Sequence, residues 1–237
     1  MTVNNHIVIT GASQGIGEAI AVAWAKEFPD SHLSLIARNE LNLKSVAEVC
    51  RATGATATVF PCDLKDSRQI TQVCTELVRE SGEPGVVVNN AGTFAPGGLS
   101  DTPLTVFEEQ IQVNLTSAFH LSSLLVPGMI KCGGGHLFFM GSVASIQAYP
   151  GSVSYGTAKH GLLGLARAIR QETFDKGIRV TTMLPGATLT PSWQEAPYPE
   201  DRFMPPEDIA AALIAAYKLS DRTVVEEILL RPQKGDI

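Results

Sequence analysis

Four polar residues have the types and the spacing to carry out proton transfer: Asn114, Ser142, Tyr155 and Lys159. Tyr155 and Lys159 are four positions apart, so in a helix they would lie on one face, one turn from each other. A nearby ammonium group favours the ionised phenol and lowers a pKa that is otherwise about 10. A phenol adjusted in this way can protonate a carbonyl oxygen or accept the proton of an alcohol. The pair therefore predicts acid–base chemistry at Tyr155.

A glycine-rich segment near the beginning of the sequence predicts a phosphate-binding turn. The apolar run 6–9 is typical of a buried strand, and it leads into Gly11, Gly15 and Gly17. Apolar side chains then recur at every fourth position from Ile16 onwards, which predicts a helix. Strand, glycine turn and helix N-terminus in this order suit a pyrophosphate, because the backbone can approach closely and the helix offers unpaired N–H groups. The alternative is a turn that only links two packed elements.

Together these motifs resemble the short-chain dehydrogenase/reductase family. The glycines follow a Gly-x-x-x-Gly-x-Gly spacing, and the other matching motifs are Asn89-Asn90-Ala91-Gly92, Ser142, Tyr155-x-x-x-Lys159 and Pro185-Gly186. Ser142 lies 13 residues before Tyr155, and Asn114 lies 28 residues before Ser142, as in the catalytic tetrad of that family. The resemblance covers essentially the whole chain and implies that Asn114, Ser142, Tyr155 and Lys159 are catalytic.

Predicted strands and helices alternate along the chain. The strand candidates are 5–10, 31–37, 56–61, 85–89, 135–141, 178–184 and 223–230. The helix candidates are about 15–28, 40–53, 66–81, 103–131, 153–176 and 206–219. Several strand candidates are apolar throughout, which is typical of a parallel sheet covered on both faces. We therefore expect a three-layer, doubly wound α/β Rossmann fold with a seven-stranded, mostly parallel sheet, in a single domain over 1–237.

Composition and charge narrow the classes of function. Hydrophobic residues make up 44% of the 237 residues, which is enough for a sizeable core. A formal net charge of −6 argues against a nucleic-acid-binding surface. The longest apolar stretches are of strand length or are interrupted by proline or charge, so we expect no membrane span. The N-terminus lacks a basic region followed by an apolar one, so we expect no secretory signal and a cytoplasmic location.

The cysteines and histidines do not form a metal-binding pattern. The four cysteines, which are Cys50, Cys62, Cys74 and Cys132, include no Cys-x-x-Cys pair, and the five histidines lack metal-ligand spacing. In a chain without a secretory signal we therefore expect reduced, buried thiols and no metal.

The end of the second predicted strand distinguishes the two nicotinamide cofactors. NAD sites usually have Asp or Glu there for the ribose 2′-hydroxyl, whereas this sequence has Ala37 and Arg38. A guanidinium can bind a 2′-phosphate through paired, charge-assisted hydrogen bonds, so we expect NADP(H). Family members that use NADP(H) often carry a basic residue just before the second glycine. Here Ser13 and Gln14 stand there, and the Ser13 hydroxyl could donate to the phosphate instead. The alternative is that Arg38 is only a solvated loop residue.

The resemblance implies further cofactor contacts. Asp63 would accept a hydrogen bond from the adenine amino group, although the local sequence fits a helix-capping Asp nearly as well. The backbone near Thr188 and the hydroxyl of Thr190 would hold the nicotinamide, unless 185–190 is only a proline–glycine turn. The complete set of predicted cofactor-binding residues is Gly11, Ser13, Gln14, Gly15, Ile16, Gly17, Arg38, Asp63, Leu64, Asn90, Ala91, Gly92, Tyr155, Lys159, Pro185, Gly186, Thr188 and Thr190.

The resemblance also assigns catalytic roles. Tyr155 would exchange the proton, Ser142 would stabilise negative charge on the carbonyl oxygen, and Lys159 would lower the phenol pKa and bind the nicotinamide ribose. Asn114 would hold a water molecule that links Lys159 to solvent. Because Asn114 interrupts an apolar helical stripe, its amide must find partners. The alternative is a core amide with a purely structural partner.

Substrate recognition is expected in a loop at about 187–205. Aromatic and apolar side chains there could wall a pocket for a planar carbonyl compound or could pack the loop onto the protein: Trp193, Tyr198, Phe203 and Met204. The predicted substrate residues are Ser142, Tyr149, Trp193 and Tyr198. The segment 222–232 resembles that of bacterial sepiapterin-reductase-type members, which reduce ketones of pteridines and related dicarbonyls.

The leading hypothesis is therefore an NADPH-dependent reductase of a small ketone or dicarbonyl, such as the pteridine sepiapterin. Reduction of a 3-oxoacyl thioester and oxidation of a hydroxy acid are alternatives, although Arg202 is the only cation in the loop, which argues against a long acyl carrier. A protein that senses NADP(H) without turnover belongs to a different class, and the intact tetrad argues against it. The resemblance also implies a homodimer or homotetramer that pairs through the helices predicted at 103–131 and 153–176.

Overall fold

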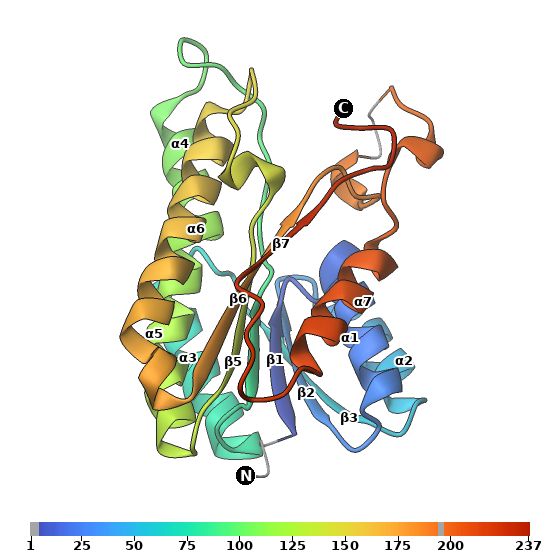
Figure 1. The fold of residues 1–237 in the computed structure, drawn as a ribbon, viewed down its shortest axis with the longest axis vertical. Helices are drawn as coiled ribbons and strands as arrows, with labels where there is room; N and C mark the ends of the chain where they lie inside the picture. Colours follow the sequence, from blue (N-terminus) through green and yellow to red (C-terminus); the bar gives the residue numbers. More distant parts are fainter. Residues whose placement is uncertain (1–4, 194–196) are drawn as a thin grey trace.

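The computed structural model describes residues 5–193 and 197–237, and its centre is a seven-stranded sheet (Figure 1). The strands are β1 (His6–Thr10), β2 (His32–Ala37), β3 (Thr56–Pro61), β4 (Val86–Asn89), β5 (Gly135–Met140), β6 (Ile178–Pro185) and β7 (Glu227–Leu230). The strand order is β3-β2-β1-β4-β5-β6-β7, and every neighbouring pair is parallel. The predicted seven-stranded sheet is confirmed, and it is parallel throughout.

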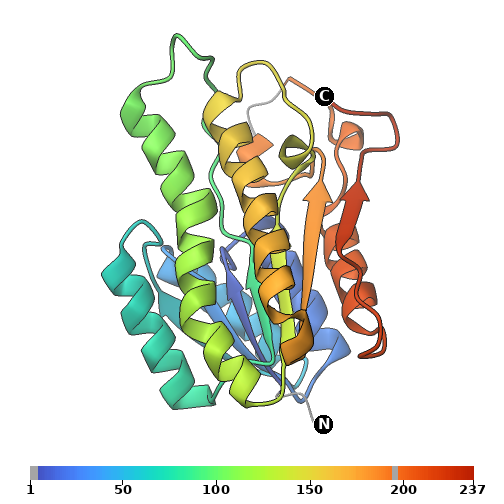
Figure 2. The same ribbon diagram turned by 60° about the vertical axis from the view of Figure 1, so that its left-hand side comes forward.

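Helices cover both faces of this sheet (Figures 1 and 2). One face carries α1 (Gly15–Glu27), α2 (Glu40–Arg51) and α7 (Pro206–Tyr217). The other face carries α3 (Ser67–Ser81), α5 (Ser117–Lys131) and α6 (Val153–Thr173), and α4 (Leu104–Ile111) packs beside α6. This arrangement confirms the predicted three-layer, doubly wound Rossmann fold.

The central strands β1 and β4 are largely apolar because they lie between two helical layers. Every residue of β1 and β4 is buried. Ile7 and Ile9 point to one face and join a core with α1, α2 and α7, whereas Val8 points to the other face and joins a core with α3, α5 and α6. Since successive side chains of a strand alternate between faces, a continuous apolar run supplies both cores.

The order of the strands reverses between β1 and β4. From β1 the chain adds β2 and then β3 in one direction, and it then returns to place β4 on the opposite side of β1. The connections that follow β1 and β4 therefore diverge. In open α/β sheets a ligand binds in the crevice that this reversal leaves at the carboxyl ends of the strands.

Most elements differ from their predicted bounds by one to three residues, and two elements differ by more. β7 begins at Glu227 rather than at 223, because the N–H of Thr223 bonds to the carbonyl of Ser220 in a turn and pairing with β6 begins only opposite Glu227. The predicted helix 103–131 is divided by a π-helical segment, Gln112–Thr116, which separates α4 from α5.

The helical run Leu104–Lys131 is long and apolar enough, by length and composition alone, to cross a membrane. The sequence predicts a helix over 103–131 but not an apolar stretch of this length. In the structure, 56% of its most apolar window is buried inside the protein. Because α5 packs against α3 and β5, its place in a core layer accounts for this hydropathy.

The four cysteines are free thiols. Three of them are buried as expected, and burial raises the pKa of Cys50 and Cys62 to about 11 and that of Cys74 to about 12. Cys132 is exposed, contrary to the expectation, because it follows the last turn of α5 at the start of a glycine turn.

Two histidines are buried within the strands. Nδ1 of His6 lies 2.9 Å from the carbonyl oxygen of Gly82, which can only accept, so Nδ1 donates and Nε2 accepts from the Ser34 hydroxyl at 2.8 Å. Nε2 of His136 lies 2.7 Å from the Thr181 hydroxyl. Burial lowers the pKa of His6 to about 4 and that of His136 to about 2, so both rings stay neutral in the folded protein.

These two histidines should make the protein less stable in acid. Their ordinary pKa is 6.5, so below that pH both histidines are protonated in the unfolded chain. In the folded protein His6 stays neutral down to about pH 4. The stabilisation is complete above pH 6.5 and is lost as the pH falls, by at most about 1.4 kcal/mol per pH unit for each histidine. Denaturant unfolding at several pH values across this range should show that the free energy of unfolding depends less steeply on pH in His6→Gln than in the wild type. His160→Gln, at an exposed position, should keep the wild-type slope. An unchanged slope in His6→Gln would contradict this account.

Candidate active site

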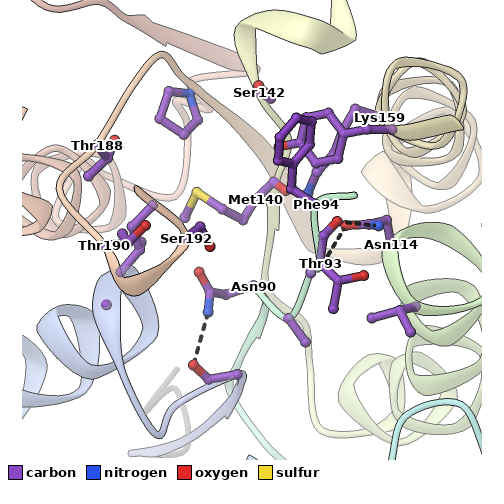
Figure 3. A pocket seen from close by; sticks show the side chains of 18 of the residues that line it. Asn90, Thr93, Phe94, Asn114, Met140, Ser142, Lys159, Thr188, Thr190 and Ser192 are labelled. Atoms are coloured by element: carbon purple, nitrogen blue, oxygen red, sulfur yellow. Dashed lines mark hydrogen bonds between the residues drawn. The ribbon is translucent and has the colours of Figure 1, made fainter. Parts of the chain in front are cut away.

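The glycine turn after β1 is fastened to the end of β4. The Thr10 hydroxyl accepts hydrogen bonds from the backbone N–H groups of Asn90 and Ala91, each at 3.0 Å, and donates to the carbonyl of Val88 at 3.3 Å. The side-chain amide of Asn90 donates to the carbonyl oxygens of Thr10 at 2.9 Å and Gly11 at 3.4 Å (Figure 3). These bonds hold the glycine turn against the first residues after β4.

Geometry requires glycine at two positions of the turn. Gly11 has a φ of +66°, and a Cβ there would lie 2.9 Å from the Cα of Ala91. A Cβ on Gly17, in the first turn of α1, would lie 2.2 Å from the carbonyl oxygen of Gly11. Both distances are shorter than real Cβ contacts, so only glycine lets α1 begin directly against the end of β1.

The first turn of α1 faces the cavity described below. Gln14 is the N-cap residue, but its side chain makes no capping hydrogen bond. Ser13, Gly15 and Ile16 line the cavity beside it. The N–H groups of a helix N-terminus and the helix dipole favour a negative charge, so this turn has the donors that a phosphate needs.

Arg38 follows β2 at the rim of the same cavity, and its side chain is exposed. Within 5–193 and 197–237 the salt bridges do not include Arg38. Its guanidinium group is therefore available to bind an anion at this end of the cavity.

Asp63 and Leu64 follow β3 and also line the cavity. The carboxylate of Asp63 accepts a hydrogen bond from the N–H of Lys65 at 3.0 Å. The N-cap of α3 is Asp66, whose carboxylate accepts from the N–H of Arg68 at 2.8 Å. The alternative interpretation of Asp63 as a helix cap is therefore wrong, and its role toward adenine stays a prediction.

Asn114 lies in the π-helical segment, where the N–H of Ser117 donates to the carbonyl of Gln112, five residues earlier. The Asn114 amide donates to the carbonyl oxygens of Thr93 and Gln110, each at 3.0 Å, and accepts from the N–H of Thr93 at 3.2 Å. In a regular α-helix the carbonyl of Gln110 would accept from the backbone N–H of residue 114, so this side chain competes with the helical ladder. Asn114 thus has the structural partners that the alternative foresaw, and its predicted water contact stays a prediction.

Ser142 follows β5 and begins a short 3₁₀ turn, Val143–Ser145. Its hydroxyl accepts from the N–H of Ala144 at 3.1 Å, and its own N–H donates to the Ser145 hydroxyl at 3.1 Å. This reciprocal pair of bonds fixes the position of the Ser142 hydroxyl, which also forms a hydrogen bond with the phenol of Tyr155.

Tyr155 and Lys159 lie one turn apart in α6. The nitrogen of Lys159 is 5.6 Å from the centroid of the Tyr155 ring and donates to the carbonyl oxygen of Met140 at 2.7 Å. Lys159 is only 3% exposed, and burial lowers its pKa to about 8. A Cβ on Gly92 would lie 3.4 Å from this nitrogen and 2.6 Å from the amide oxygen of Asn114, so both side chains border Gly92.

The pKa of Tyr155 differs from the sequence prediction. We expected the neighbouring ammonium group to lower it, but burial of the phenol raises the pKa, and the hydrogen bond from Ser142 only partly offsets this. The physical reason is that Lys159 faces the tyrosine ring and bonds to Met140 rather than to the phenol oxygen. Burial also weakens the preference of Lys159 for its charged form.

The segment after β6 forms the side of the cavity that lies across from Lys159 and Asn114 in Figure 3. Pro185 ends β6, and the N–H of Gly186 donates to the carbonyl of Leu230 at 2.8 Å. Thr188 and Thr190 line the cavity. A Cβ on Gly15 would lie 3.2 Å from the methyl carbon of Thr190, so this threonine lies beside the glycine turn.

The loop predicted at about 187–205 is anchored at its base, and its residues 194–196 lie outside the described ones. The N–H of Leu189 donates to the carbonyl of Met204 at 2.8 Å, and the N–H of Met204 donates to the carbonyl of Ala187 at 3.0 Å. Met204 is buried in the core with α1 and α7, so it packs the loop onto the protein.

The aromatic side chains of this loop divide between two roles. Trp193 lines the cavity, and its ring lies 5.3 Å from that of Phe203 between centroids. Tyr198 is 42% exposed and is not among the cavity-lining residues. Its predicted place at the substrate is therefore corrected: the side chain projects from an exposed stretch between Pro197 and Pro199.

The cavity has a volume of about 1100 Å³ and collects residues from the carboxyl ends of β1 to β6. This exceeds the range of roughly 300–1,000 Å³ typical of sites for one drug-sized ligand. All predicted catalytic, cofactor and substrate residues line it except Gly17, which packs against the turn, and Tyr198. The predicted residues from both ends of the sequence thus share one space.

The sequence analysis missed Phe94 and Asp236, which also line the cavity. Phe94 is 46% exposed, and its ring lies edge-on to that of Tyr155 with 5.1 Å between centroids. Its position two residues after Gly92 could have indicated it. Asp236 accepts a hydrogen bond from the hydroxyl of Tyr149 at 2.6 Å, and nothing in its local sequence points to the site.

Comparison with known proteins agrees with this geometry. A family model described as short chain dehydrogenase matches residues 5–201. The chain belongs to the short-chain dehydrogenase family. A sepiapterin reductase of Chlorobaculum tepidum is 37% identical to this family member over 240 residues, which cover 98% of the chain and 97% of that relative.

Solved structures of the same family are also similar. An alcohol dehydrogenase from the archaeon Thermococcus sibiricus, complexed with 5-hydroxy-NADP, has a TM-score of 0.89 at 28% identity, with 96% of each chain covered. A metagenomic short-chain oxidoreductase in complex with NADP has a TM-score of 0.85 at 28% identity, with 98% of this chain and 99% of that chain covered. The short-chain dehydrogenase described here is therefore an oxidoreductase that acts on CH–OH or C=O groups.

Proposed function

We propose that this short-chain dehydrogenase is an NADPH-dependent reductase of a small ketone or dicarbonyl, with pteridines such as sepiapterin as the leading substrate class. The cofactor is NADP(H), in keeping with the two solved relatives named above. One observation carries the proposal: the glycine turn, the exposed side chain of Arg38 and the group of Ser142, Tyr155 and Lys159 line the same cavity.

The phosphate groups of NADP(H) fit one end of this cavity. Gly11 lines the cavity without a side chain, and Gly17 lets α1 begin directly against the turn. The uncapped start of α1 would donate its N–H groups to the pyrophosphate. Arg38 would bind the 2′-phosphate, and Ser13 would add a hydroxyl group.

The two rings of NADP(H) would lie on either side of these phosphate contacts. Asp63 and Leu64 would receive the adenine, while Thr188 and Thr190 would hold the nicotinamide near Lys159. The bound cofactor supplies the hydride that reduces the carbonyl carbon.

Tyr155 would donate the proton to the carbonyl oxygen of the substrate. Because burial raises its pKa, the phenol stays protonated near neutral pH, which is the form that a carbonyl reduction needs. The hydroxyl of Ser142, already fixed by its turn, would donate to the same oxygen as negative charge develops. One such donor contributes a factor of about 10²–10³ in rate.

Lys159 would stabilise the phenolate that remains after proton transfer and would bind the nicotinamide ribose. With a pKa of about 8 it can also give up a proton within the working range of pH. Asn114 and Lys159 both border Gly92, which supports a water molecule between them that restores the proton from solvent.

The substrate class rests on similarity and on the cavity lining. The identity of 37% over nearly the full length of a sepiapterin reductase favours a pteridine or another dicarbonyl. Phe94 and Trp193 offer flat apolar surfaces in the cavity, which suit a planar compound.

A 3-oxoacyl thioester is the alternative substrate. A 3-oxoacyl-acyl-carrier-protein reductase of Thermotoga maritima is 29% identical, with 87% of each chain covered. Arg202 is the single cation in 187–205, so this loop does not offer a cluster of basic groups to a carrier. A carbonyl panel that includes both substrate classes distinguishes them.

We further propose that the protein is a homodimer or homotetramer. The helices Leu104–Ile111 and Ser117–Lys131 carry large apolar side chains that face solvent, including Leu104 at 70% exposure and Phe119 at 54%. An apolar face of this kind is typical of an interface between subunits.

Tyr155→Phe should remove the proton donor while leaving the ring in place. We expect kcat for NADPH-dependent carbonyl reduction to fall by about 10²–10⁴, with the Kd for NADPH unchanged. Tyr217→Phe, on α7 and away from the cavity, should retain full activity. Steady-state kinetics and the fluorescence of bound NADPH measure the two effects. Unchanged turnover in Tyr155→Phe would refute the mechanism, and NADPH binding without turnover in the wild type would favour the sensor.

Arg38→Gln should reduce the preference for NADPH over NADH. Loss of charge-assisted hydrogen bonds to the 2′-phosphate costs about 1.5–3 kcal/mol, so the ratio of kcat/KM values should fall by roughly 10- to 100-fold. Arg68→Gln, an exposed arginine of α3 outside the cavity, is the control and should keep the ratio. A wild-type preference for NADH would overturn the role of Arg38.

Phe119→Asp should weaken subunit association. Light scattering of the wild type should give two or four times the mass of one chain, and the variant should give a lighter species, because a buried carboxylate opposes contact between apolar faces. Leu41→Asp, at a position of α2 that is 78% exposed, should leave the mass unchanged. A monomeric wild type would contradict the proposal.

A further inference from the structure

The segment 231–237, which follows β7, completes the cavity wall. Its residues Asp236 and Ile237 line the cavity, although they lie far in sequence from the glycine turn and from Tyr155. The residues of this segment have no role in the proton and hydride transfer proposed above.

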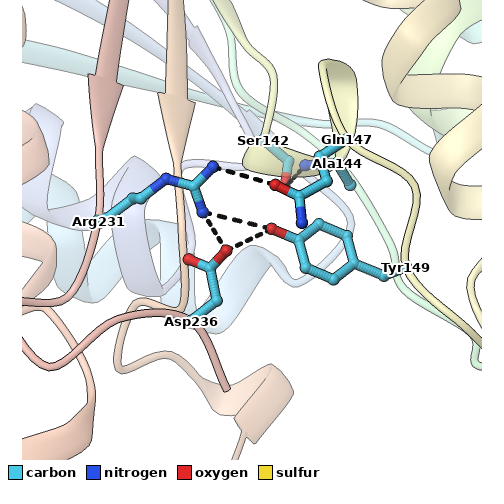
Figure 4. A network of polar contacts seen from close by, with 6 residues as sticks. All are labelled: Ser142, Ala144, Gln147, Tyr149, Arg231 and Asp236. Atoms are coloured by element: carbon cyan, nitrogen blue, oxygen red, sulfur yellow. Dashed lines mark hydrogen bonds and ion pairs between the residues drawn. The ribbon is translucent and has the colours of Figure 1, made fainter.

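A group of four polar side chains, here called the clasp, joins this segment to the other side of the cavity (Figure 4). The clasp consists of Gln147, Tyr149, Arg231 and Asp236. The hydroxyl of Tyr149 donates to the Asp236 carboxylate at 2.6 Å, and the Arg231 guanidinium forms an ion pair with the same carboxylate. Arg231 also donates to the Tyr149 hydroxyl and to the amide oxygen of Gln147, each at 3.4 Å. Arg231 is the one member that contacts all the others.

The clasp holds the chain segment that connects Ser142 to Tyr155. Gln147 and Tyr149 belong to the stretch 146–151, which leaves the turn of Ser142 and enters α6 shortly before Tyr155. Residues 146–148 of this stretch are exposed, so the core does not hold them. At its far end the stretch is held by a backbone bond from the N–H of Gly97 to the carbonyl of Gly151 at 2.8 Å. In the middle, the hydroxyl of Ser152 donates to the carbonyl of Tyr149 at 2.7 Å, and the clasp adds anchors through the side chains of Gln147 and Tyr149.

The ion pair of the clasp is less exposed to solvent than an ordinary surface ion pair. The side chains of Arg231 and Asp236 are 33% and 25% exposed, whereas those of Lys234 and Asp201, a second ion pair of this segment, are 60% and 64% exposed. Exposed pairs contribute little, because water screens the charges. The partly buried, multiply bonded Arg231 is therefore the anchor that can hold a loop in one position.

We propose that Arg231 is a positioning residue: through Tyr149 and Gln147 it holds the connection between Ser142 and Tyr155 so that both hydroxyl groups face the carbonyl oxygen of the substrate. The inference rests on the proposed reductase function. Arg231 does not touch the reacting atoms, so its loss affects catalysis through the placement of Ser142 and Tyr155. The sheet does not depend on it, since β6–β7 pairing and the bond from Gly186 to Leu230 hold β7 independently.

Kinetics of Arg231→Gln test the proposal. We expect kcat/KM for the carbonyl substrate to fall by about 10- to 100-fold, while the Kd for NADPH stays within about twofold of the wild type. Arg231→Lys keeps the charge that pairs with Asp236 and should recover part of the loss. The double variant Arg231→Gln with Asp236→Asn should have a kcat/KM no lower than that of the less active single variant, because both changes break the same clasp.

A matched control is available at the opposite end of β7, where Glu226 precedes the strand. Arg170 forms a 2.6 Å ion pair with Glu226 and is not among the cavity-lining residues, so Arg170→Gln removes an arginine–carboxylate pair without touching the clasp. This variant should keep wild-type kcat/KM. An equal loss in Arg170→Gln would overturn the proposal, because the effect would then be a general loss of stability.

Hydrogen exchange of the backbone provides a readout that does not need turnover. Peptides covering 143–152 should exchange faster in Arg231→Gln and in Tyr149→Phe than in the wild type and in Arg170→Gln. Tyr149→Phe removes only one hydroxyl group, so it tests the clasp even if Arg231→Gln does not fold. Wild-type exchange in both clasp variants would overturn the proposal. If the wild type reduces no carbonyl compound, the proposed function fails, and exchange alone still decides whether the clasp holds this connection.

Discussion

The hydrogen bonds between the ends of β1 and β4 are the constraint on which the site depends. These two strands are neighbours at the point where the strand order reverses, so the chain leaves them in different directions. The hydroxyl of Thr10 and the amide of Asn90 join the two ends before they diverge. The glycine turn is thereby placed against Ala91, and the next residue, Gly92, borders both Asn114 and Lys159. One local set of bonds therefore relates the phosphate-binding turn to the catalytic group.

Burial controls the protonation of the groups inside this framework. It lowers the pKa of Lys159 to about 8 and raises that of Tyr155, because a low-dielectric environment disfavours the charged form of each. The same effect keeps His6 and His136 neutral near the amino ends of β1 and β5, outside the cavity. A protonated phenol beside a fixed serine hydroxyl suits the donation of a proton to a carbonyl oxygen. Desolvation therefore keeps the phenol of Tyr155 in its protonated form, whereas attraction to Lys159 would favour the ionised form.

The two ends of the cavity are built differently. Strand ends and a helix N-terminus form the end at which we propose that the cofactor binds, and the parallel sheet positions them. The proposed substrate end consists of the loop that carries Trp193, of Phe94 and of the segment 231–237, which side-chain contacts join to Tyr149. Relatives that share the fold, such as a sepiapterin reductase and a 3-oxoacyl-acyl-carrier-protein reductase, bear names with different substrates. A rigid cofactor end with loops at the other end accommodates such variety.

The sequence by itself determined the alternation of strands and helices, the glycine turn and the Tyr155–Lys159 pair, because backbone conformation and helical spacing act over a few residues. The tertiary structure decided where β7 begins, how Asn114 interrupts its helix, and that Met204 and Tyr198 lie away from the cavity. It also reversed the expected pKa shift of Tyr155, since burial depends on what packs around the phenol. The contact of Tyr149 with Asp236 joins residues 87 positions apart. No local pattern encodes such a contact, because only the complete fold brings the two side chains together.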